Sequence, residues 1–328
     1  MEDIDLLTYI NIKRCSNIFF LCYNGLGDNM QIFATLLTFL FWGIADLFYK
    51  LGNQGEGNRN HLKTGIMVGL VMGIHGTFLL ITTHTSIHFI DIIKYLPVSL
   101  CYIASMVIGY KGLKYLELSI SSPIQNTSGV IVALLFIIFF KEHYNYPFYI
   151  AVIFIFIGII ILSLIGLEKN KKERKEFNKK NTFQKILTLT ILFPLGYCLL
   201  DGLGTFLDGI YLDKLEIIGE TASLIAYEYT FAIFGLITFI YLKTKKESFT
   251  ITKEKPKLAA ALFETAGEIF YVTAMSGNST IAAPIIGSYC VLSMLLSRIF
   301  LKEKLSIKEY IGILFVLIGV IILALMDV

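Results

Sequence analysis

Residues 119–164, which read SISSPIQNTSGVIVALLFIIFFKEHYNYPFYIAVIFIFIGIIILSL, are repeated as residues 280–325, which read TIAAPIIGSYCVLSMLLSRIFLKEKLSIKEYIGILFVLIGVIILAL. The two stretches align without a gap at an offset of 161 residues, and 19 of the 46 aligned positions are identical. Apolar composition alone can match isoleucine to isoleucine, but it does not bring a proline, a Lys-Glu pair and a glycine into one register. The chain therefore contains a duplicated hydrophobic unit.

The composition indicates a membrane protein. The chain has 328 residues, of which 55% are hydrophobic and 16% are charged, and its mean hydropathy is +0.70. Soluble globular proteins are about 45–50% apolar and about 25% charged. Here the charges gather in short stretches between apolar runs, and a helix of about 20 apolar residues crosses the ~30 Å hydrocarbon core of a bilayer. The expected fold class is an all-α integral membrane protein.

Ten apolar spans can be drawn along the chain. They are roughly 32–49, 63–83, 93–110, 119–140, 147–166, 186–210, 218–242, 257–276, 280–301 and 308–326. Five spans fall in residues 30–167 and five in residues 185–328, and the charged segment 168–184 joins them as a solvated linker. An odd number of spans makes the second unit enter the membrane from the opposite side, so the sequence predicts two inverted five-helix repeats.

Residues 1–29 are mixed, polar and without periodicity, so they are expected to form a separate N-terminal extension. Two interpretations stay open for it. Met30 is the native start of the protein, or the extension is an arm that lies at the membrane interface.

The distribution of Lys and Arg predicts an orientation. The connections after odd-numbered spans hold 23 of the 28 basic residues, and only Lys13, Arg14, Lys94, Lys141 and Lys214 lie elsewhere. The positive-inside rule then places those connections in the cytoplasm and both termini outside.

No pattern in the sequence indicates a cofactor, a bound metal or a nucleic-acid partner. The five cysteines have no paired spacing and are expected to be buried small residues. His84, His88 and Asp91 have a spacing that could hold a metal, but they fall in a predicted connection. The sequence has no GxxxxGK[ST] or HExxH motif, so neither ATP-driven pumping nor a metalloprotease is expected.

The repeated pattern resembles a known family. Both copies have a proline-headed span closed by Lys-Glu and followed by a glycine-centred apolar span, and Trp42-Gly43 lies in the first span. This pattern resembles the EamA type of the drug/metabolite transporter superfamily. The resemblance implies a ten-helix transporter whose central cavity is lined by spans 1, 3, 4, 6, 8 and 9, with spans 5 and 10 at the periphery. It also implies cytoplasmic termini, contrary to the charge distribution.

Ionisable residues within the spans are the main candidates for function, since each costs about 2.5–3.5 kcal/mol on insertion scales. Glu264 and Glu268 are spaced i,i+4 near the middle of span 8, so they share one helix face. Two neighbouring carboxyl groups in a low dielectric cannot both ionise cheaply, so the pair is expected to keep one shared proton at neutral pH. A proton shared in this way suits proton-coupled transport. The alternative is a hydrogen-bonded pair that serves only packing. Asp201, beside Gly202 and Gly204, is a candidate substrate or proton site.

Other polar residues complete the set of candidates. Asp46 and Asp208 lie near span ends and are expected to face interfacial water or gate residues, whereas Glu228 is either a cavity group or a buried, hydrogen-bonded acid. Pro123 and Pro284 are expected to break or direct the helices near their first turn, which could leave free N–H groups for an anionic group. The candidate cavity-lining residues are Trp42, His75, Gln125, Asn126, Ser288 and Tyr289.

The sequence thus predicts a multi-pass protein of the plasma membrane that acts with the lipid bilayer, a small-molecule substrate and protons as its partners, as a monomer or a homodimer. The expected function is secondary active transport, in the export direction, of small metabolites such as amino acids or amines by alternating access. A facilitative permease and a membrane enzyme that acts on lipid are the alternatives. No catalytic motif favours an enzyme.

Overall fold

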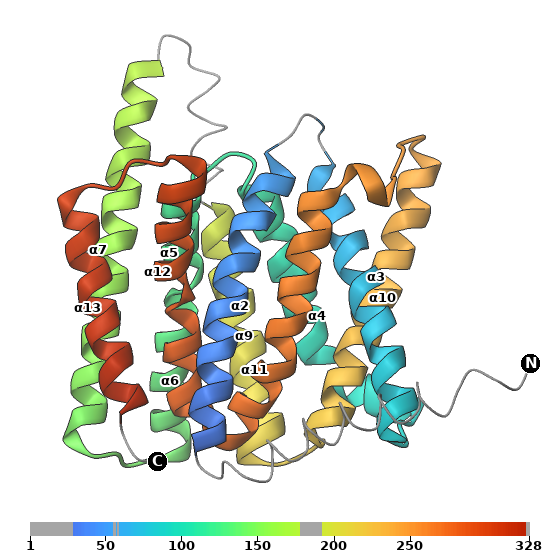
Figure 1. The fold of residues 1–328 in the computed structure, drawn as a ribbon. Helices are drawn as coiled ribbons and strands as arrows, with labels where there is room; N and C mark the ends of the chain where they lie inside the picture. Colours follow the sequence, from blue (N-terminus) through green and yellow to red (C-terminus); the bar gives the residue numbers. More distant parts are fainter. Residues whose placement is uncertain (1–28, 55–56, 58, 178–191, 326–328) are drawn as a thin grey trace, which may run out of the picture.

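The computed structural model describes residues 29–54, 57, 59–177 and 192–325, and every regular element within them is helical (Figure 1). Two predicted segments lie outside the described residues: the N-terminal extension up to residue 28 and residues 178–184 of the linker. The helices of the first half are α2 (Asn29–Asn53), α3 (Asn60–Thr83), α4 (Phe89–Gly112), α5 (Leu118–Gln125), α6 (Thr127–Phe140) and α7 (Tyr146–Phe177).

The second half follows the same order. Its elements are α9 (Leu192–Gly209), the π-helical turn η1 (Ile210–Lys214), α10 (Glu220–Thr244), the 3₁₀ turn η2 (Ile251–Lys253), α11 (Lys255–Gly287), α12 (Tyr289–Leu296), the π-helical turn η3 (Ser297–Leu301) and α13 (Ile307–Ala324).

Eight helical segments within the described residues are long and apolar enough to cross a membrane. Their outward faces carry large hydrophobic side chains, such as Ile74, Ile138 and Leu236, which are 65%, 68% and 61% exposed. A helix that is apolar on its exposed face suits a lipid environment, because apolar side chains are stable against lipid chains and unfavourable in water. The protein is therefore a multi-pass, all-helical membrane protein.

The helix breaks differ from the simplest sequence expectation. Helix α11 runs without a coil segment from predicted span 8 into span 9, but Asn278 has non-helical backbone angles (φ −150°, ψ 88°) that divide it. Pro123 and Pro284 lie inside α5 and α11 rather than in a first turn. The helices are interrupted a few residues later, at Asn126 and Ser288, whereas a proline disrupts the turn before it by removing its bond to the carbonyl four residues earlier.

The repeated Lys-Glu pair has a structural reason. Lys141 ends α6 with φ 54° and ψ 38°, and Lys302 ends η3 with φ 59° and ψ 27°. Both lysines therefore adopt the left-handed conformation that commonly terminates a helix. The helix that follows the second turn, α13, begins with a capping box in which Ser306 and Glu309 accept each other's backbone N–H groups.

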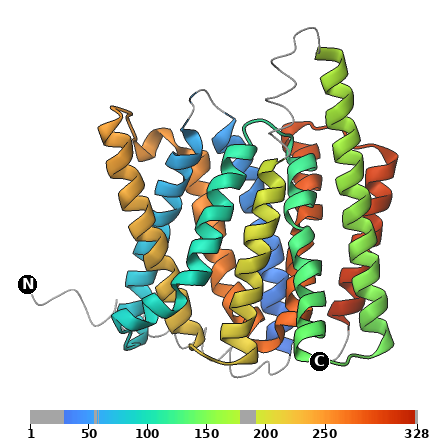
Figure 2. The same cartoon turned by 180° about the vertical axis from the view of Figure 1, so that it is seen from behind.

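The two halves interlock helix by helix. Helix α2 packs against α11 and α4 packs against α9, while α3 packs against α10 and α7 against α13. Figures 1 and 2 place the α3–α10 pair at one edge of the molecule and the α7–α13 pair at the other, with the remaining helices between them. Glycines permit the closest crossings: a Cβ at Gly69 of α3 would lie 2.3 Å from the carbonyl oxygen of Phe231 on α10.

Helix α7 continues well past the membrane-spanning segment Tyr146–Gly166, and it projects beyond the other helices in Figure 1. The first residues of the predicted linker 168–184 are therefore helical as far as Phe177.

Candidate functional site

A buried cavity lies between the two halves. The helices that line it are α2, α4, α5, α6, α9, α11 and α12, with one residue from α10. Among the described residues, the peripheral helices α7 and α13 contribute none of the cavity lining. Spans 1, 3, 4, 6, 8 and 9 thus line the cavity, as the family resemblance implied, and Tyr227 of α10 is an addition to that expectation.

Three carboxylates from three different helices face this cavity: Asp46 on α2, Asp201 on α9 and Glu264 on α11. The Ser122 hydroxyl donates to Asp46 over 2.6 Å, and the Ser128 hydroxyl donates to Asp201 over 2.8 Å. Each hydroxyl comes from the first half, from α5 or α6, just before or just after the break at Asn126.

The carboxylates converge on one region. Glu264 has Asp46 and Asp201 as electrostatic neighbours, and the Tyr289 hydroxyl has all three carboxylates as neighbours. Asp46 is only 6% exposed, so of the two surroundings expected for it, interfacial water or gate residues, it does not face interfacial water. The packing of α2 against α11 and α12 brings this end of α2 over the cavity instead.

Aromatic side chains form much of the cavity wall. Trp42 stacks on Tyr271 with ring centroids 4.9 Å apart and meets Tyr289 edge-on at 6.1 Å. The Trp42 indole N–H donates to the Glu264 carbonyl oxygen over 3.3 Å. A Cβ at Gly267 would lie 2.3 Å from the indole ring, so only glycine at this position lets the ring lie against α11.

Two further acids lie behind this wall. Glu268 is 2% exposed, and its electrostatic neighbours are Asp208, Glu264 and Glu228. Asp208 is fully buried and accepts a hydrogen bond from the Tyr95 hydroxyl, so of the two surroundings expected for it, interfacial water or gate residues, it does not face interfacial water. A chain of carboxyl groups therefore leads from Glu264, in the cavity, through Glu268 towards Asp208 and Glu228. Neither Glu268 nor Asp208 is among the lining residues.

Glu228 and His75 form a separate pair. His75 Nδ1 lies 2.6 Å from a Glu228 carboxylate oxygen, which joins α3 to α10. The Glu228 side chain is fully buried and that of His75 is 21% exposed. Of the two predictions for Glu228, the geometry matches a buried, hydrogen-bonded acid. His75 is not among the cavity-lining residues, because this pairing holds it on the outer α3–α10 pair.

Four of the remaining candidates, Gln125, Asn126, Ser288 and Tyr289, lie at or beside the helix breaks, and Trp42 lies within α2. Trp42, Gln125, Asn126 and Tyr289 all line the cavity. Ser288 does not, since its hydroxyl turns back to donate to the Pro284 carbonyl oxygen over 2.7 Å.

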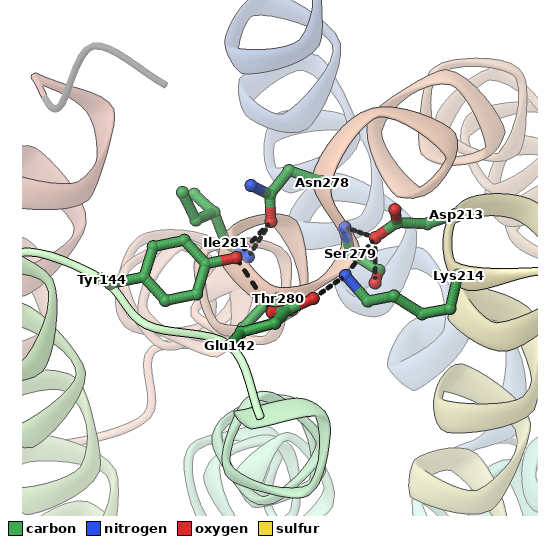
Figure 3. Close-up of polar contacts among 8 residues, drawn as sticks. All are labelled: Glu142, Tyr144, Asp213, Lys214, Asn278, Ser279, Thr280 and Ile281. Carbon is green, nitrogen blue, oxygen red and sulfur yellow. Dashed lines mark hydrogen bonds and ion pairs between the residues drawn. The ribbon is translucent and has the colours of Figure 1, made fainter. Parts of the chain in front are cut away.

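A polar cluster fills one end of the molecule, where the loop after α6 meets the end of η1 and the kink in α11 (Figure 3). Lys214 forms ion pairs with Glu142 and with Asp213. The Thr280 hydroxyl donates to Glu142 over 2.6 Å. The Ser279 backbone N–H and hydroxyl both donate to Asp213, over 2.8 and 2.6 Å. The cluster joins the first half to the second.

The charge state of Glu142 follows from its neighbours. Partial burial alone would raise the pKa of this carboxyl, but its contacts with Lys214, Thr280 and Tyr144 outweigh that effect. The pKa of Glu142 therefore lies below its ordinary value.

The opposite end has a corresponding arrangement. Lys50 donates to the carbonyl oxygen of Leu113 over 2.7 Å and also to that of Leu116. Glu303 accepts from the backbone N–H groups of Leu118 and Ser119, both over 3.0 Å. In the repeat register Glu303 corresponds to Glu142, and Ser119 corresponds to Thr280. Each repeated glutamate therefore contacts the start of the proline-bearing helix of the other half.

Sequence reasoning missed most of the aromatic wall and both of these end clusters. One signal was present, since Tyr110 corresponds to Tyr271 in the repeat register, and both line the cavity. The tyrosines that line the cavity without having been predicted are Tyr49, Tyr102, Tyr110, Tyr197, Tyr227 and Tyr271.

Within the described residues, no group of three or more His, Cys, Asp and Glu side chains is arranged to hold a metal. His84 and Asp91 have structural positions instead. His84 ends α3 in the left-handed conformation, and Asp91 accepts the His88 backbone N–H at the start of α4 over 3.0 Å.

The fold and the cavity define a polytopic helical membrane protein with a buried, acidic site between two repeated halves. Residues 29–164 and 188–325 each match the EamA-like transporter family, so the chain belongs to this family. An uncharacterized protein from Methanocaldococcus jannaschii is 28% identical over 97 residues, which are 28% of this chain and 71% of that protein. A crystal structure described only as that of a protein has a TM-score of 0.63 and 9% identity, covering 89% of this chain and 96% of the other. That likeness supports the fold alone.

Proposed function

We propose that this protein is a secondary active transporter that exports small metabolites, such as amino acids or amines, by alternating access and in exchange for protons. One observation carries the proposal: the cavity between the two halves is lined by Asp46, Asp201 and Glu264. Ionisable groups at this depth are costly, and they commonly mark a substrate or proton pathway. Membership in a transporter family agrees with this interpretation.

The proposed transporter crosses the plasma membrane ten times as two inverted repeats. The eight qualifying segments include residues 255–301, which are divided at Asn278 and would cross twice, and α9 would supply one more crossing. The packing pattern supports a two-fold relation between the halves. In the repeat, α2, α3, α4 and α7 correspond to α9, α10, α11 and α13. Exchanging the halves therefore turns the α2–α11 contact into the α9–α4 contact, while the α3–α10 and α7–α13 contacts map onto themselves. The lysine-rich connections would face the cytoplasm.

Proton coupling is assigned to Glu264 and Glu268. Glu264 faces the cavity, whereas Glu268 lies behind it among other carboxyl groups. Neighbouring carboxyl groups share protons. A shared proton can leave when a ligand enters the cavity and return when the ligand departs. Asp201 and Asp46 are assigned to substrate binding, because Ser128 and Ser122 orient their carboxylates in the cavity.

Reconstituted protein provides the test. Purified protein in liposomes should show counterflow of a radiolabelled mixture of amino acids and amines, and an imposed pH gradient should drive accumulation. The double variant Glu264→Gln with Glu268→Gln should lose gradient-driven accumulation entirely. It should unfold at the same temperature as the wild type or higher, because two costly buried acids are removed.

Glu216→Gln is the matched control, since it removes one carboxylate at an exposed position outside the cavity. It should transport like the wild type. Wild-type rates in the double variant would contradict the assignment of proton coupling. Counterflow that ignores the pH gradient would identify a facilitative permease, and lipid turnover without flux would identify an enzyme.

A further inference from the structure

We propose that the cavity binds an organic cation, a primary amine or a quaternary ammonium, that also carries a hydrogen-bond acceptor. This inference rests on the proposed transport function and names its substrate class. It narrows the proposed substrates to the amines and excludes both zwitterions, such as ordinary amino acids, and anions.

The first argument is charge. Asp46, Asp201 and Glu264 face the cavity, and among the described residues that line it there is no Lys, Arg or His. A ligand carboxylate would be buried among three acids without a cation beside it. Burying a charge without a partner is costly, whereas an ammonium group would find a carboxylate in several directions.

The second argument concerns the helix breaks, which could otherwise supply N–H groups to an anion. Several of the N–H groups around them already bond to the chain. Asn126 donates to the Ser122 carbonyl oxygen over 3.0 Å, and Ser288 donates to that of Ile285 over 3.1 Å. Val291, one turn into α12, donates to the Ser288 carbonyl oxygen over 3.0 Å. These three N–H groups are therefore not available to an anion at the breaks.

The third argument is the aromatic wall. Trp42, Tyr271 and Tyr289 meet in one corner of the cavity, and Tyr289 is also the neighbour of all three carboxylates. Aromatic faces attract ammonium groups through the ring quadrupole, most strongly when the pair is desolvated. Rings and carboxylates together are the arrangement that recognises an alkylammonium group.

Gln125 provides an independent sign of a ligand. Its side chain is only 3% exposed and lines the cavity, and its Nε2 atom has no hydrogen-bond partner among the described residues. A buried amide donor without a partner is destabilising, so it marks a place where a ligand acceptor would fit. The substrate therefore carries a hydroxyl or carbonyl oxygen in addition to its cationic group.

Binding to the purified full-length protein tests the charge requirement. Phenethylamine, phenylalanine and 3-phenylpropanoate share one skeleton and differ in charge, and calorimetry or thermal shift measures their affinities. Phenethylamine should bind at least about tenfold more tightly than the other two, and Asp201→Asn and Glu264→Gln should each weaken it by about tenfold or more. Glu216→Gln should leave it unchanged.

The acceptor requirement has its own test. Tyramine adds a phenol oxygen to phenethylamine and should bind more tightly to the wild type. Gln125→Leu should remove that advantage while leaving phenethylamine binding within about twofold, because leucine keeps the apolar volume and loses the amide donor.

The wild-type ligand series decides the matter even if a variant fails to fold. Equal binding of the three probes, tighter binding of the zwitterion or the anion, or no binding of phenethylamine would each overturn the inference. These outcomes are distinct from failure of the proposed function. Binding of the cation without any counterflow in liposomes would contradict the proposed transport but not the cation site. Counterflow of amino acids alone would support transport and contradict the cation site.

Discussion

The two ends of the molecule are built from the same repeated Lys-Glu turn, yet they are held by different chemistry. At one end Glu303 accepts backbone N–H groups and Lys50 donates to backbone carbonyl groups, and both side chains are buried, at 8% and 5% exposed. At the other end Glu142 meets Lys214 and a threonine hydroxyl, and the Glu142 side chain is 20% exposed. Duplication therefore kept the place of the contact and changed the groups that make it.

This difference has a physical consequence. Contacts to backbone groups fix the chain path, and breaking them leaves buried donors or acceptors without partners. Contacts between partly exposed side chains are replaced by water at little cost. We expect the Glu142 end to open more readily than the Glu303 end, and the predictions that follow test this asymmetry from the largest effect to the smallest.

The largest contrast is expected for the two lysines. Lys50→Met leaves the carbonyl groups of Leu113 and Leu116 buried without their charged donor, and it should lower the free energy of unfolding by about 2–3 kcal/mol. Lys214→Met removes ion pairs at a partly exposed site and should cost about 1 kcal/mol or less. Unfolding of both variants in mixed micelles measures the difference. Equal losses would show that the two ends are energetically alike.

A smaller contrast is expected for the repeated glutamates. In Glu303→Gln one amide oxygen can accept only part of what the carboxylate accepts, so the N–H of Leu118 or Ser119 loses its partner at a cost of about 1–2 kcal/mol. Glu142→Gln keeps an acceptor for Thr280 and should cost less than about 1 kcal/mol. The same unfolding assay compares them, and a larger loss in Glu142→Gln would contradict the asymmetry.

The smallest expected effect is a pH dependence at the Glu142 end. Because the folded-state pKa of Glu142 is below its ordinary value of 4.5, ionised Glu142 stabilises the fold above about pH 4.5, and this contribution is lost as the pH falls through the lowered pKa. The difference in unfolding temperature between the wild type and Glu142→Gln should therefore shrink below pH 4.5. A difference that stayed constant from pH 7 to pH 3.5 would contradict this assignment.

The sequence predicted the scaffold well because its signals are local. Apolar runs and the Lys-Glu register located the helices and the two repeated units, while the inversion of the second unit stays a prediction. Packing details were less accessible. The position of Asp46 over the cavity depends on the contact of α2 with α11 and α12, and no local pattern near Asp46 reports that contact.

The candidate site was predicted in part, for the same reason. Spacing within one helix brought Glu264 and Glu268 together, but it did not indicate that only Glu264 lines the cavity. The pairing of His75 with Glu228 joins residues 153 positions apart. The cluster of Lys214, Asp213 and Ser279 requires the kink at Asn278, and an asparagine within a helical segment is a weak signal for a break.

The most direct test of the account is to cross-link each end in turn. Cysteine pairs at equivalent positions, Glu142→Cys with Thr280→Cys and Glu303→Cys with Ser119→Cys, would be made in a background without native cysteines and joined by a short bifunctional thiol reagent. If the two ends alternately close a transport path, either cross-link should abolish counterflow of the amino acid and amine mixture in liposomes, and its cleavage should restore it. Full counterflow with either end cross-linked would contradict the account.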